Sequence, residues 1–134
     1  MSQVSRLAMP KSLEDQMHKA LRKAFADLRT EDEVGEFLED LLSPTERIML
    51  GKRLSIAVLL DKGYDHRTIG KILKVSVTTV HTVNYWLKQQ GSGYRSVLAK
   101  IKSQEQWQSF TQELTKFVGD YLTVTGQLRK LRKL

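Results

Sequence analysis

The stretch DHRTIGKILKVSVTTVHTVNYWLKQQG, residues 65–91, predicts two short helices joined by a three-residue turn. Asp65 can cap a first helix from Arg67 to Leu73, because its carboxylate can accept backbone N–H groups of the first helical turn. Ser76 can cap a second helix from Val77 to about Lys88 in the same way. Apolar residues recur along one side of each helix and predict where the two helices pack: Ile69, Leu73, Val80, Val83 and Leu87.

The side chains left on the outward face of the second helix are neutral: Val77, Thr78, His81, Thr82 and Tyr85. Such groups suit base edges and thymine methyl groups in a major groove. Cations suited to phosphate contacts surround them, namely Arg67, Lys71, Lys74 and Lys88. Gly70 allows the two helices to approach closely and Val75 plugs the turn, so the pattern predicts a DNA-binding helix-turn-helix. The alternative is a plain pair of crossing helices whose threonines and histidine face solvent.

The charge of the chain is unevenly distributed along its 134 residues, which carry a net charge of +7. Residues 1–42 hold six basic and nine acidic side chains, whereas residues 43–102 hold eleven basic and three acidic ones. Residues 103–134 hold five basic and three acidic side chains. The basic middle segment favours a polyanionic partner, although the acidic first segment could neutralise part of its charge.

Three further helices are predicted before the helix-turn-helix. Residues 11–28 place apolar side chains at spacings of three and four, which indicates a helix with one apolar stripe. A capping box at residues 30–33 starts the second helix. Residues 43–46, Ser-Pro-Thr-Glu, start a third helix that should end at Asp61 or Lys62. Its apolar residues surround most of its circumference, which predicts a central helix or the core of a dimer.

Four short segments of the sequence belong together: LLSPTER at 41–47, LGKRL at 50–54, VSVTTV at 75–80 and GSGYR at 91–95. They resemble the tryptophan repressor family, and most closely its poorly characterised bacterial branch. The resemblance covers about residues 28–102 and implies an all-α bundle that forms an intertwined homodimer, with the helix at 44–61 as its core. It also implies two recognition helices that reach successive major grooves about 34 Å apart, hence double-stranded DNA with an inverted-repeat operator.

The resemblance also implies where a small effector would bind. Arg53 matches an arginine of the family's tryptophan pocket, and Thr82 stands where a second arginine stacks on the indole. Val83 replaces a small residue beside it, and Trp86 replaces a hydroxyl-bearing one. With three of the four features changed, we do not expect tryptophan to act as corepressor, and another small effector remains open.

Residues 103–134 lie outside the resemblance and predict an added amphipathic helix that starts at a capping box formed by Ser103 and Gln106. It can lie on the chain's own core, or it can add a dimer contact or a docking surface for another protein. Four cations in residues 129–134 can form a solvated tail or contact phosphates. The apolar seam of this helix comprises Trp107, Phe110, Leu114, Phe117, Tyr121, Val124, Leu128 and Leu131.

Several function classes lack the residues that they need. The chain has no cysteine, its three histidines show no metal-ligand spacing, and it contains neither a phosphate-binding glycine loop nor a nucleophile elbow. We therefore expect no catalytic residue, no metal and no cofactor. No apolar run is long enough for a membrane helix or a signal peptide, so we expect a cytoplasmic protein without a membrane partner.

Together these patterns predict a helix-turn-helix domain at residues 11–102, with the motif at about 66–88, between a flexible arm at 1–10 and a C-terminal helical extension with a basic tail at 103–134. The predicted function is a homodimeric, sequence-specific transcriptional regulator that binds double-stranded DNA. The alternative is a helical interaction module that binds an acidic protein partner through the basic face or the C-terminal seam.

Overall fold

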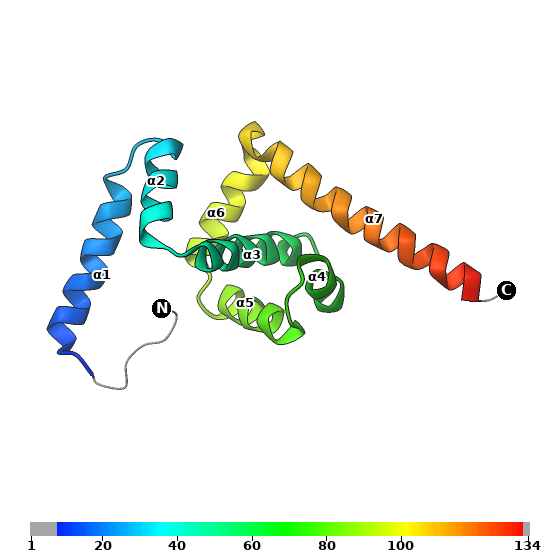
Figure 1. Ribbon diagram of the computed structural model, residues 1–134, viewed down its shortest axis with the longest axis horizontal. Helices are drawn as coiled ribbons and strands as arrows, with labels where there is room; N and C mark the ends of the chain where they lie inside the picture. The colour runs from blue at the N-terminus through cyan, green and yellow to red at the C-terminus, as the bar shows by residue number, and fades with distance from the viewer. Residues whose placement is uncertain (1–7, 133–134) are drawn as a thin grey trace. The chain divides into compact units, whose positions relative to one another are not determined.

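The computed structural model describes residues 8–132, apart from the side chains of residues 125–132. The described residues form helices and no strand, which confirms the predicted all-α class, and none of these helices is long and apolar enough to cross a membrane (Figure 1). The chain divides into two compact units, residues 1–50 and 51–134. In chain order the elements are α1 (Lys11–Ala26), α2 (Glu31–Leu41), α3 (Pro44–Asp61), α4 (His66–Leu73), α5 (Val77–Gln89), α6 (Ser92–Ser103), the 3-10 turn η1 (Glu105–Trp107) and α7 (Gln108–Arg132).

The first unit contains α1, α2 and the beginning of α3. The helices α1 and α2 run antiparallel, and the rings of Phe25 and Phe37 meet edge to face with their centroids 5.3 Å apart (Figure 1). The predicted cap of α2 is present, because the Thr30 hydroxyl accepts the backbone N–H of Glu33 at 3.1 Å. The Glu33 carboxylate does not complete the box and instead accepts the N–H of Arg29 at 2.9 Å.

The described residues of the first unit include no buried side chain. The predicted apolar stripe of α1 is present, but Leu13, Met17 and Leu21 are all exposed. Ile48 and Met49, in the first turns of α3, are exposed as well. The described residues of this unit therefore carry extensive apolar surface and form no interior of their own.

The start of α3 has the reciprocal capping box that the sequence predicts. The Ser43 hydroxyl accepts the backbone N–H of Glu46 at 3.2 Å, and the Glu46 carboxylate accepts the N–H of Ser43 at 2.9 Å. This backbone bond from Ser43 lowers the pKa of Glu46. Arg47 donates to the carbonyl oxygens of Glu39 and Leu42, both at 3.1 Å. These bonds tie the end of α2 to the start of α3.

The second unit has one hydrophobic core, to which the end of α3 contributes four consecutive buried residues, 56–59. Four neighbouring positions span a full turn, so the end of α3 is enclosed on all sides. The helix ends at Asp61, as predicted, and Gly63 follows in the left-handed region with φ 91°. The other buried members of the core come from α4 to α7: Ile69, Val80, Val83, Leu98, Ile101, Leu114 and Val118.

The beginning of the C-terminal extension differs from the prediction. Ser103 is the last residue of α6 rather than a cap, and the chain turns through η1 before α7 begins at Gln108. In α7, Leu114 lies in the core, but Phe117 is 61% exposed and Val118 takes the inward position with 1% exposure. A straight α-helix has 3.6 residues per turn and drifts from a heptad seam, which explains this shift.

Some predicted features fall largely outside the described residues. The arm at residues 1–10 is described only from residue 8, and the side chains of Leu128, Leu131 and the basic tail at 129–134 are not described.

Candidate nucleic-acid interface

Two side-chain caps define where α4 and α5 begin. The Asp65 carboxylate accepts the backbone N–H of Thr68 at 3.2 Å, and the Ser76 hydroxyl accepts that of Thr79 at 3.1 Å. Hydrogen bonds from the side chain and backbone of Thr68 lower the pKa of Asp65. Because of these caps α4 begins at His66, one residue before its predicted start, and α5 begins at the predicted residue.

The turn between α4 and α5 is tight and has a left-handed residue at its first position. Lys74 has φ 57° and ψ 51°, and the N–H of Val75 donates to the carbonyl of Gly70 at 2.9 Å. A Cβ on Gly70 would lie 3.0 Å from the Val75 carbonyl oxygen, so the backbone of the turn passes close to this glycine. Lys52 of α3 donates from Nζ to the Lys74 carbonyl at 3.3 Å and joins the turn to the central helix.

All five residues predicted to contact bases lie exposed on α5: Val77, Thr78, His81, Thr82 and Tyr85. Tyr85 protrudes most clearly, with 61% of its surface exposed. The Thr82 hydroxyl donates to the carbonyl of Thr78 at 3.0 Å, so this residue presents chiefly its methyl group. The His81 ring forms a hydrogen bond with His66 of α4. The structure therefore brings these five side chains onto one element with their surfaces uncovered.

The four cations predicted to contact phosphates are exposed: Arg67, Lys71, Lys74 and Lys88. Within the described part of the chain, their side chains make no hydrogen bond and no ion pair. The sequence has no acidic residue between Asp65 and Glu105, so no carboxylate of α4, α5 or α6 neutralises them. Clustered cations without local counter-charges create a positive potential that attracts polyanions.

Arg95 of α6, for which no contact was predicted, binds the C-terminal end of α5. Arg95 of α6 donates through Nη1 to the Leu87 carbonyl and through Nη2 to the Gln90 carbonyl, both at 3.0 Å. A guanidinium at a helix C-terminus satisfies free carbonyls and complements the helix dipole. Gly91 makes the turn with φ 44°. A basic residue four positions after such a glycine is the only sequence signal for this contact.

The two residues predicted to bind an effector lie on different helices, Arg53 on α3 and Thr82 on α5. The Arg53 guanidinium of α3 lies 5.7 Å from the ring centroid of Trp86, within cation–π range. A broad open cavity of about 720 Å³ lies beside Trp86 and is lined by Leu54, Tyr94 and other residues, but Arg53 and Thr82 are not among them. Arg53 therefore faces the protein's own indole.

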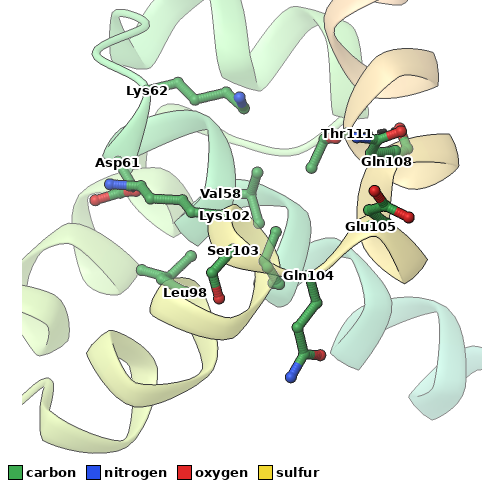
Figure 2. A pocket seen from close by; sticks show the side chains of 11 residues that line it. Val58, Asp61, Lys62, Leu98, Lys102, Ser103, Gln104, Glu105, Gln108 and Thr111 are labelled. Atoms are coloured by element: carbon green, nitrogen blue, oxygen red, sulfur yellow. Dashed lines mark hydrogen bonds and ion pairs between the residues drawn. The ribbon is translucent and has the colours of Figure 1, made fainter.

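A smaller cavity of about 220 Å³ lies where α3, α6 and α7 meet, away from the exposed face of α5 (Figure 2). Val58 and Leu98 form part of its apolar lining. Figure 2 shows Lys102 reaching Asp61, and the Nζ to Oδ2 distance is 2.8 Å. This ion pair fastens the end of α6 to the end of α3 at the corner from which α7 departs.

Comparison with known proteins gives one match. The family model described as Trp repressor protein matches residues 16–102, which is well over half of the chain. The match covers α2 to α5 completely, together with most of α1 and α6, and it ends before α7. No curated protein and no solved structure matches the chain.

Proposed function

The chain belongs to the Trp repressor family, a family of DNA-binding regulators, and we propose that it is a sequence-specific transcriptional regulator of double-stranded DNA. The observation that carries this proposal is the surface of α4 and α5, where neutral exposed side chains stand among cations that have no partner in the described part of the chain. Such a regulator works in the bacterial cytoplasm and needs no catalytic residue, metal or cofactor.

Affinity and sequence preference come from different residues in this proposal. Arg67, Lys71, Lys74 and Lys88 contact phosphates, which supplies affinity and fixes the position of the protein on the duplex. Val77 and Thr82 offer methyl groups to thymine, and the polar groups of Thr78, His81 and Tyr85 face base edges.

The active species is a homodimer in this proposal. The exposed apolar residues of the first unit, among them Leu13, Met17, Leu21 and Ile48, support it, because apolar surface of this extent is stable in water only when something covers it. A two-fold dimer places two recognition helices about 34 Å apart and selects an inverted repeat.

Tryptophan does not control this regulator in our proposal. The contact between Arg53 and the indole of Trp86 supports this, since it engages the one pocket residue that matches the family. A tryptophan ligand would have to displace Trp86 from Arg53. Adding L-tryptophan should therefore leave DNA affinity unchanged, and a tenfold or greater rise would contradict this part of the proposal.

Selection of bound duplexes from a random pool tests the proposed function. The expected result is an enriched inverted repeat whose half-sites are about one helical turn apart. Lys71→Gln should weaken binding to every duplex alike, whereas Thr78→Val should change the preferred bases by ~1–3 kcal/mol at one position of each half-site. If the pool shows no enrichment, the protein does not read sequence. If both variants behave alike, the division between phosphate and base contacts is wrong.

A second candidate function is favoured by the outward side of α7. Phe117, Leu122 and Val124 are exposed on this helix, and Phe117 and Val124, seven positions apart, share one face that can hold a protein partner. In that case α4 and α5 serve only to pack the core, and the basic face binds an acidic protein. Binding to a random duplex at low salt separates the two candidates, because only the first predicts it, with a steep loss of affinity as salt rises.

A further inference from the structure

Two histidines from different helices meet at the candidate interface. His66 is the first residue of α4, and His81 lies on the exposed face of α5, fifteen positions later in the sequence. Their Nδ1 atoms are 3.0 Å apart, and their rings meet edge to face with centroids 4.4 Å apart. Within the described residues this is the only hydrogen bond between a side chain of α4 and one of α5.

The contact constrains the protons of both rings. A hydrogen bond between two Nδ1 atoms needs one nitrogen that carries a proton and one that does not. A neutral imidazole carries its single proton on one nitrogen only, so the role of Nδ1 determines the role of Nε2. If Nδ1 of His81 accepts, its Nε2 is a donor, and if Nδ1 donates, its Nε2 is an acceptor.

We propose that His66 is a positioning residue that fixes the ring orientation and the tautomer of His81, and thereby determines which base the recognition helix α5 prefers opposite His81. This inference rests on the proposed function. A fixed donor at Nε2 suits the acceptors N7 and O6 of guanine, whereas a fixed acceptor suits the amino groups of adenine or cytosine. An imidazole that is free to rotate and to exchange tautomers distinguishes these edges poorly.

His66→Ala and His66→Asn form a matched pair of variants. Alanine removes the hydrogen bond at the first helical position, where it is well tolerated. Asparagine can donate or accept at nearly the place of Nδ1, so it should restore the contact. His18→Ala is the control, because His18 belongs to α1, where its Nε2 lies 3.6 Å from a carboxylate oxygen of Glu14.

The first measurement needs no DNA. Nitrogen-15 chemical shifts of the imidazole nitrogens, recorded at a pH where the rings are neutral, report the tautomer of each ring. In the wild type we expect a single tautomer for each ring, with the proton on Nδ1 in one and on Nε2 in the other. In His66→Ala the His81 signals should move toward those of a free imidazole, and His66→Asn should move them back toward the wild-type values because the hydrogen bond is restored. Unchanged His81 signals in His66→Ala would overturn the inference.

The second measurement compares base preferences. His81→Ala identifies the base pair that His81 contacts: it is the position at which duplexes selected by this variant no longer show the base preference of the wild type. His66→Ala should reduce discrimination at that same pair from about tenfold to about twofold, while the other positions and the salt dependence stay as in the wild type. His66→Asn should recover most of it.

The outcomes separate this inference from the proposed function. If the wild type prefers one sequence and His66→Ala keeps that preference in full, the inference alone is wrong. If His66→Ala weakens all positions uniformly, His66 acts on the fold and not on His81, which also overturns it. If the wild type shows no sequence preference, the proposed function fails and this inference fails with it.

Discussion

Replacing Lys74 by glycine should make the protein more stable and a weaker DNA binder. Lys74 adopts φ 57° and ψ 51°, which costs an L-residue roughly 1–2 kcal/mol and glycine almost nothing. The greater backbone entropy of glycine in the unfolded chain offsets about 0.5–1 kcal/mol of this gain. We therefore expect the free energy of unfolding to rise by about 0.5–1 kcal/mol, which is an increase of about 3 °C in Tm.

The same substitution removes one cation from each protomer of the proposed dimer. Each phosphate contact contributes about 0.9 to the slope of log K against log salt, so two lost contacts should reduce the slope by about 1.8. The loss of affinity should then grow from little at about 1 M salt to about 60-fold at about 0.1 M.

Fluorescence polarisation of a labelled duplex over a salt series measures the slope, and thermal unfolding followed by circular dichroism measures Tm. Lys100→Gln is the control, because it removes a lysine from α6 and should leave both the slope and the left-handed turn unchanged. A slope equal to that of the wild type would show that Lys74 does not reach a phosphate. A lower Tm would show that the left-handed conformation of Lys74 does not destabilise the native state.

Three further substitutions test the caps and turns. Gly91→Ala should lower the free energy of unfolding by about 2 kcal/mol or more, because a Cβ in this left-handed position would overlap the Leu87 carbonyl oxygen; urea unfolding measures the loss. Ser76→Ala should cost about 1 kcal/mol through the lost cap of α5, seen as a lower Tm with an unchanged urea m-value. The lowered pKa of Asp65, caused by Thr68, means that its cap stabilises the fold above the ordinary carboxyl pKa of 3.8 and loses this effect as pH falls through the lowered value. The free energy of unfolding of Asp65→Asn should therefore fall less steeply than that of the wild type as the pH is lowered through this range.

The starts of the helices could be predicted because each depends on residues a few positions apart. Ser43 with Glu46, Asp65 with Thr68, and Ser76 form their capping bonds within one turn of backbone. Such contacts need only the local chain to be helical, so a short stretch of sequence contains all the information. The exposed face of α5 could be predicted for the same reason, since it is what remains once the inward apolar positions are assigned.

Contacts between distant residues could not be predicted in this way. The inward turn of Val118 in place of Phe117 depends on how α7 lies against the core, which the spacing of apolar residues does not determine. The hydrogen bond between His66 and His81 depends on the angle between α4 and α5. The hydrogen bonds from Arg95 to the end of α5 depend in the same way on the angle between α5 and α6. No motif marks either pair, because the distances arise only after the chain has packed.

The lack of buried side chains before residue 51 in the described chain also has a consequence for how the protein behaves on dilution. A folded segment must repay its lost conformational entropy with apolar area removed from water, and residues 8–50 as a lone chain have little such area to offer. If a second copy supplies the missing cover, the order of α1 and α2 depends on how many molecules are present. Amide hydrogen exchange would then accelerate in α1 and α2 as the sample is diluted, while α4 and α5 stay protected. The concentration of the protein would then determine the fraction of chains in which α1 and α2 are folded.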